Sequence, residues 1–182
     1  MENLLLILAL AIGLAMDAFA VAVAQGAAGH SSIFHATRTG MAFGVAQGIM
    51  PFLGWALGIA FVSHISTYDH WIALILLSGL GLKMLWEARG GNENIPEPSL
   101  SGWALGTAAI ATSIDTFAAG ITLPALGLPV LLTCIAIGTI TALLSSLGVM
   151  IGGMASSRIG KYAEVAGGII LIALGIKIFV EY

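Results

Sequence analysis

Two aspartates lie inside apolar segments that are each long enough to cross a lipid bilayer. Asp17 lies within Met16–Ala20, and Asp115 lies within the similar stretch Ile114–Ala118 in the other half of the chain. A carboxylate at the centre of a membrane costs about 2.5–3.5 kcal/mol or more, so a residue of this kind marks a functional site. One such residue in each half predicts a site for a cation that crosses the membrane.

The composition predicts a chain embedded in lipid. Of the 182 residues, 59% are hydrophobic and only 8% are charged, whereas soluble domains carry about 25% charged residues. The net charge of −3 is too small to predict a nucleic-acid partner, and the single cysteine excludes a disulfide framework. The sequence therefore predicts an all-α integral membrane protein, a single transmembrane domain over residues 1–182 that contacts membrane lipids.

Six segments have the length of about 20 residues that a membrane-spanning helix needs. Their expected ranges are 4–25, 39–62, 71–88, 101–123, 129–154 and 163–180. The most polar connector, residues 89–99, contains Gly-Gly, Asn-Glu-Asn and two prolines. This connector is expected to separate two halves of three helices each.

The two halves, about 1–90 and 100–182, repeat each other. Leu-Gly at 53–54 matches Leu-Gly at 147–148, and Lys83 matches Lys177 at the same offset. Because each half has an odd number of spans, the second half must enter the membrane upside down relative to the first. The expected fold is six transmembrane helices as two inverted three-helix repeats. Many secondary transporters have this layout, with the substrate site near the midplane.

Basic residues set the expected orientation. Arg38, Arg89, Arg158 and Lys161 lie in the first, third and fifth connectors, and the second and fourth connectors carry no Lys or Arg. Basic connectors favour the cytoplasmic side, so both termini are expected outside the cytoplasm.

The second span contains the main neutral candidates for binding a cation. Pro51 removes the backbone hydrogen bond to the carbonyl of Gln47, so this carbonyl and the side-chain amide of Gln47 both become available. Met50 lies on the same helix face as Gln47. A kink that serves packing only is the alternative, since Gly40, Gly44 and Gly48 form a close-packing stripe in the same span.

The candidate metal ligands are oxygen-rich as a set. Thr112 shares a helix face with Asp115, and Thr141 occupies the position in the second half that is equivalent to Gln47. The full set is Asp17, Gln47, Met50, Thr112, Asp115 and Thr141. Carboxylate, amide and hydroxyl oxygens suit Mg²⁺, Ca²⁺ or Mn²⁺, whereas zinc or copper(I) would favour histidine and cysteine.

Short motifs along nearly the whole chain resemble one known family. They are Met16–Ala20, Arg38–Gly40, Phe43–Gly44 with Met50–Pro51 and Gly54–Trp55, His70–Ala73, Ala111–Asp115 and Ala166–Gly168. These motifs are similar to those of the bacterial MntP-type manganese exporters in the lysine-exporter superfamily. The resemblance implies a six-helix inner-membrane exporter of cytoplasmic Mn²⁺, with Mn²⁺ as substrate and no cofactor. It also implies that the family's acidic residues in the first and fourth helices fall on Asp17 and Asp115.

The sequence therefore predicts a divalent-cation exporter of the alternating-access type and not an enzyme. Because a divalent cation needs deprotonated ligands, exchange against protons at the two carboxylates is the simplest coupling. Two alternatives stay open. One is a cation channel or small-solute exporter of the wider superfamily. The other is an intramembrane aspartyl protease, because two aspartates can share a proton as a dyad. The inverted repeat and the lack of a Gly-x-Gly-Asp sequence argue against the protease.

Overall fold

The described part of the molecule is a bundle of long α-helices without strands. The computed structural model describes residues 2–27, 31–65, 102–154 and 158–181, with isolated positions between 74 and 89. The helices are α1 (Glu2–Ala27), α2 (Ile33–Ile65), α4 (Gly102–Leu126), α5 (Val130–Gly152) and α6 (Arg158–Glu181). They coincide with five of the predicted spans. The predicted span at 71–88 lies largely outside the described residues.

Three of the described helices are long and apolar enough to cross a membrane, over Asn3–Ala27, Ile33–Ile59 and Val130–Gly152. Their outward faces carry large apolar side chains that remain exposed, among them Leu5, Met41, Val45, Leu131 and Leu143. Apolar faces of this extent are stable against lipid and unfavourable in water. The all-α class and the membrane location predicted from composition are therefore confirmed.

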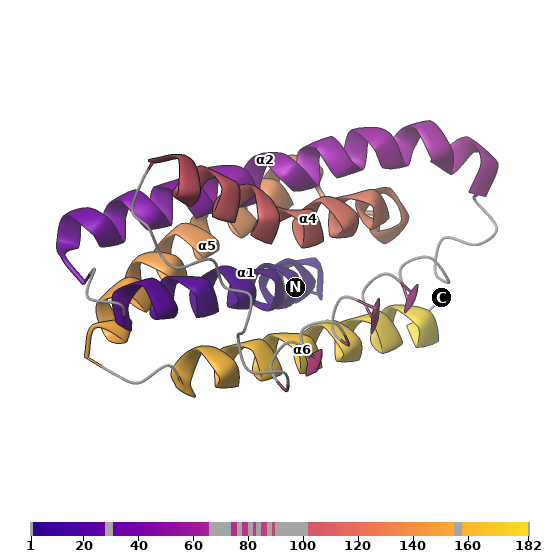
Figure 1. Ribbon diagram of the computed structural model, residues 1–182. Helices are drawn as coiled ribbons and strands as arrows, with labels where there is room; N and C mark the ends of the chain where they lie inside the picture. Colours follow the sequence, from indigo (N-terminus) through magenta and orange to yellow (C-terminus); the bar gives the residue numbers. More distant parts are fainter. Residues whose placement is uncertain are drawn as a thin grey trace.

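Helices from opposite halves of the chain pack against each other. α5 lies between α1 and α2 and contacts both along their length (Figure 1). α4 packs along α2, and α6 packs along α1 on the other side of the bundle. By contrast, α1 and α2 follow each other in sequence and make few contacts. The two halves are thus interleaved rather than placed side by side.

Glycines at the helix crossings allow the backbones to approach closely. In α2, a Cβ atom built on Gly44 would lie 2.7 Å from the carbonyl oxygen of Gly138 in α5. A Cβ atom built on Gly58 would lie 2.6 Å from the carbonyl oxygen of Ile121 in α4. Real Cβ atoms do not approach an oxygen this closely, so both positions require glycine. The glycine stripe predicted in the second span is thus a packing surface, as is common where helices associate in lipid.

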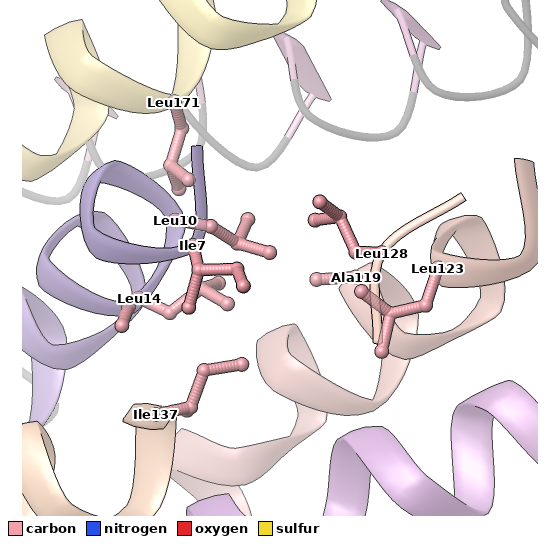
Figure 2. Close-up of a cluster of buried hydrophobic side chains, with 9 residues drawn as sticks. Ile7, Leu10, Leu14, Ala119, Leu123, Leu128, Ile137 and Leu171 are labelled. Carbon is pink, nitrogen blue, oxygen red and sulfur yellow. The ribbon is translucent and has the colours of Figure 1, made fainter. Parts of the chain in front are cut away.

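Two apolar clusters fill the interior at different levels. The Leu-rich cluster consists of Ile7, Leu10, Ala11, Leu14, Ala119, Leu123, Leu128, Ile137 and Leu171, whose side chains turn toward one another (Figure 2). The Ala-rich cluster consists of Ala18, Ala22, Ala36, Phe43, Leu105, Ala109 and Val149. The residues of the Leu-rich cluster come before Asp17 in α1 and after Asp115 in α4. The residues of the Ala-rich cluster come after Asp17 in α1 and before Asp115 in α4. Both aspartates therefore lie between two apolar layers.

Candidate cation site

A chain of hydrogen bonds joins α1, α2 and α5 between the two apolar clusters. Gln47 Nε2 donates to Asp17 Oδ1 at 3.3 Å. Thr141 Oγ1 donates to Gln47 Oε1 at 2.9 Å. Gln47 and Thr141 are fully buried, and Asp17 is partly buried. Three of the six residues predicted from sequence are therefore in direct contact.

The hydrogen bonds fix the orientation of the Gln47 amide. Because the Thr141 hydroxyl donates to Oε1, the amide nitrogen faces Asp17. Oε1 keeps a second lone pair, which can accept another donor or a cation. The backbone N–H of Ala18 also donates to Asp17 Oδ1, at 2.6 Å. Among the contacts within the described helices, two neutral donors thus orient the carboxylate of Asp17.

Asp115 reaches the same level from α4. Its side chain is buried, with 6% of its surface exposed. Gly54 and Gly58 in α2 lie against Phe117 and Ile121 in α4, so the two helices run in the same direction. Gly120 packs against Pro51, and Phe117 packs against Gly54. Counting back from these contacts places Asp115 level with the turn of α2 that contains Gln47 and Pro51.

Thr112 and Met50 do not join the hydrogen-bonded chain among the described residues. The hydroxyl of Thr112 donates to the carbonyl oxygens of Ala108 and Ala109, each at 3.1 Å, within its own helix. Met50 is partly buried, one turn from Gln47 in α2. Their predicted roles as metal ligands remain predictions.

A second buried polar pair was not predicted from sequence. Thr39 Oγ1 in α2 donates to Gln25 Oε1 in α1 at 3.0 Å, and both side chains are buried. The sequence feature that could have indicated this pair is a glutamine at the end of one apolar segment and a threonine at the start of the next. Their pairing depends on how α1 and α2 are placed by α5, which the sequence does not specify.

The described helices bring few charged side chains to the level of Asp17 and Asp115. Within the described ranges, no group of three or more histidine, cysteine, aspartate or glutamate side chains could hold a metal ion. In the part of the chain that the structure describes, the candidate ligands at this level are two carboxylates together with amide, hydroxyl and carbonyl oxygens. Such a donor set favours a hard divalent cation over a soft one.

Comparison with known proteins identifies the family. A family model described as "Mntp: Putative manganese efflux pump" matches residues 30–179. The chain belongs to this family. The matched range contains α2, α4 and α5, which carry Gln47, Asp115 and Thr141. No solved structure matches the chain.

Individual relatives extend the similarity to the first helix. A protein of Sorangium cellulosum named "Putative manganese efflux pump MntP" is 44% identical over 189 residues, which cover 99% of this chain and 97% of the relative. Proteins of the same name from Citrobacter koseri and Clostridium botulinum are 42% and 41% identical. They cover 93% and 99% of this chain, and 92% and 96% of the relatives' own length. Coverage of 99% of the chain takes in the segment with Asp17.

Proposed function

We propose that this chain exports Mn²⁺ from the cytoplasm across the inner membrane. Relatives named as manganese efflux pumps are 41–44% identical to it over nearly its whole length. The observation that carries the proposal is the intramembrane carboxylate of Asp17, bound to Gln47 at the level that Asp115 reaches from α4. Two carboxylates offset the charge of a divalent cation, and neutral oxygens replace part of its water shell.

Contacts between equivalent positions support two inverted repeats. Gly44 and Gly138 are equivalent in the two halves, and a Cβ atom on either one would lie 2.7–2.8 Å from the carbonyl oxygen of the other. Gln47 and Thr141 are also equivalent, and they share a hydrogen bond. Reciprocal contacts of this kind are expected where a two-fold axis relates two units. The proposed axis therefore passes between α2 and α5.

The outer helix pairs support the same symmetry. In α2, Gly54 packs against Phe117, two residues after Asp115. In α5, Gly148 packs against Phe19, two residues after Asp17. Each half thus packs its second helix, in parallel, on the first helix of the other half. Because α2 and α4 run in the same direction, the chain between them has to return across the membrane once. That requirement supports the predicted third span at 71–88 and a total of six.

The two apolar clusters support alternating access rather than a permanently open pore. With both termini outside the cytoplasm, the Leu-rich cluster closes the outer side of the site, and the Ala-rich cluster closes the inner side. Rocking of the two repeats about the α2–α5 axis would open one side while closing the other. Mn²⁺ needs deprotonated carboxylates, so its binding from the cytoplasm would expel protons. Protons taken up from the outside would then neutralise the empty site, and the transporter could return to the state that is open to the cytoplasm.

Transport by purified protein tests this proposal. Proteoliposomes should accumulate Mn²⁺ with the wild-type protein and lose that activity with Asp17→Asn or Asp115→Asn. These substitutions keep the size of the side chain and remove the charge. Ser146→Ala in α5 is the matched control, because its hydroxyl donates to the Ala142 carbonyl of the same helix. If either asparagine variant inserts normally and still transports Mn²⁺ at the wild-type rate, the site with two carboxylates is wrong.

A further inference from the structure

Ser145 is a buried serine whose hydroxyl makes no hydrogen bond among the described residues. Its side chain is 0% exposed. Among the buried side-chain oxygen and nitrogen atoms of the described residues, the Ser145 Oγ atom is the one without a hydrogen-bond partner. Buried polar groups without a partner are rare because leaving one unsatisfied is unfavourable, so each requires a specific explanation.

The other buried hydroxyls in the described interior are satisfied. Four of them donate to a carbonyl oxygen three or four residues back in the chain at 2.6–3.0 Å, namely Ser113, Thr116, Thr122 and Thr133. The usual acceptor of a helical serine is the carbonyl oxygen three or four residues back. The neighbouring Ser146 follows this rule with Ala142, at 2.8 Å. Ser145 does not, so its hydroxyl remains available for another partner.

The packing of α5 on α1 places Ser145 at the level of Asp17. In α5, Ser145 lies one helical turn after Thr141, on the same face. Three residues after Ser145, Gly148 packs against Phe19 and Ala22 of α1, which runs parallel to α5. Counting back three residues in both helices brings Ser145 opposite residues 16–19. That turn carries Asp17, whose carboxylate is linked through Gln47 to Thr141.

We propose that the Ser145 hydroxyl oxygen is a ligand of the transported divalent cation, beside the carboxylate of Asp17. This assignment rests on the proposed export of Mn²⁺ and adds a donor from the second half of the chain. A neutral hydroxyl is a hard oxygen ligand, and it needs to lose no proton to bind a cation of this class.

The equivalent position in the first half supports this role. Pro51 is equivalent to Ser145, and it removes the helical hydrogen bond to the Gln47 carbonyl. Each half therefore provides an oxygen that lacks its usual helical hydrogen bond, within one turn of this position in its second helix. In the first half it is a backbone carbonyl, and in the second half it is a side-chain hydroxyl. The unsatisfied hydroxyl thus has a counterpart across the proposed two-fold axis.

Titration of the detergent-purified protein with Mn²⁺ tests the role of Ser145. Ser145→Ala should weaken Mn²⁺ binding by about tenfold, the lower end of the losses seen on altering groups around metal sites. Ser145→Cys replaces a hard oxygen with a soft sulfur of similar size. It should raise the affinity for Cd²⁺ relative to Mn²⁺ by about tenfold. Ser146→Ala and Ser146→Cys are the matched controls, and both should behave as wild type.

The outcomes separate this inference from the proposed function. If the wild-type protein binds Mn²⁺ and Ser145→Ala binds it equally well, Ser145 is not a ligand, although export stands. If Ser145→Cys leaves the ratio of Cd²⁺ affinity to Mn²⁺ affinity unchanged, Ser145 is likewise not a ligand. This second variant decides whether Ser145 is a ligand if Ser145→Ala fails to fold. If wild-type protein neither binds nor transports Mn²⁺, the proposed function fails and this inference fails with it.

Discussion

At the scale of single residues, the amide of Gln47 connects the carboxylate of Asp17 to the hydroxyl of Thr141. Gln47→Ala removes this connection and one proposed ligand oxygen, but it leaves both carboxylates in place. We expect Mn²⁺ transport to weaken without being abolished, with the apparent KM rising by about tenfold. Thr141→Val should have a smaller effect in the same direction, because it removes only the group that orients the amide.

The control for Thr141→Val is Thr133→Val in the same helix. The hydroxyl of Thr133 is also buried, but it donates to the Pro129 carbonyl oxygen and not to another helix. Transport by Thr133→Val should match wild type. Equal losses in the two threonine variants would mean that the measurement reports the packing of α5 and not the orientation of Gln47.

Residues of the site differ in how far the sequence predicts them. Asp17 can be predicted from sequence because a carboxylate inside an apolar segment is energetically costly. Thr141 can be predicted because it occupies the position in the second repeat that is equivalent to Gln47. The hydrogen bond between Gln47 and Thr141 was not predicted, since equivalent residues meet only if the symmetry axis passes between them. The unsatisfied hydroxyl of Ser145 could not be predicted either. Whether a helical serine bonds to its own backbone depends on its side-chain rotamer.

At the scale of elements, Pro51 lies inside α2, and the helix continues through it from Ile33 to Ile65. Pro51→Ala should restore the hydrogen bond to the Gln47 carbonyl and withdraw this oxygen from the site. We expect impaired Mn²⁺ transport with normal insertion. Pro124→Ala, the same change in α4, is the control, and it should have a smaller effect because it lies nine residues beyond Asp115. Full activity of Pro51→Ala would reduce the role of this proline to packing.

The crossing of α2 and α5 can be tested by adding a single methyl group. A Cβ atom on Gly44 would lie 2.6 Å from Ala142 Cβ and 2.7 Å from the Gly138 carbonyl oxygen. A Cβ atom on Gly48, one turn later, would meet nothing closer than 3.6 Å. Gly44→Ala should therefore destabilise the detergent-solubilised protein by about 1–3 kcal/mol, the usual cost of overpacking, and lower its Tm. Gly48→Ala should be neutral, and equal Tm values for the two variants would contradict this crossing geometry.

Sequence predicts the elements more completely than their packing. Apolar length predicts where the helices lie, and their ends differ from the predicted ends by about one to six residues, with α5 slightly shorter than predicted. The glycine spacing predicts a packing stripe in α2 but not that its partners are Gly138 and Ala142 in α5. Partners depend on the interleaving of the halves, since α1 and α2 are neighbours in sequence but not in the bundle.

At the scale of the whole molecule, the basic connectors predict that both termini lie outside the cytoplasm. In a Cys134→Ala background, an impermeant thiol reagent added outside the cell should label a cysteine at Asn3 or Thr67. It should not label a cysteine at Asn92 or Ser157 until the membrane is permeabilised. The reverse pattern would invert the orientation of both repeats, and the Leu-rich cluster would then close the cytoplasmic side.

Coupling to protons is the prediction that involves the whole transport cycle. The proposed site has two carboxylates, and a carboxylate that binds a metal ion has to be deprotonated. Because the metal needs the deprotonated carboxylates, the apparent Mn²⁺ affinity of the purified protein should fall as the pH is lowered. Binding should also release protons, which calorimetry in buffers of different ionisation enthalpy measures directly. Asp17→Asn should release fewer protons per bound ion, and Ser146→Ala should release as many as wild type. If the affinity does not depend on pH and no protons are released, protons do not exchange for Mn²⁺ at this site, and export would have to be driven by the membrane potential or by another ion.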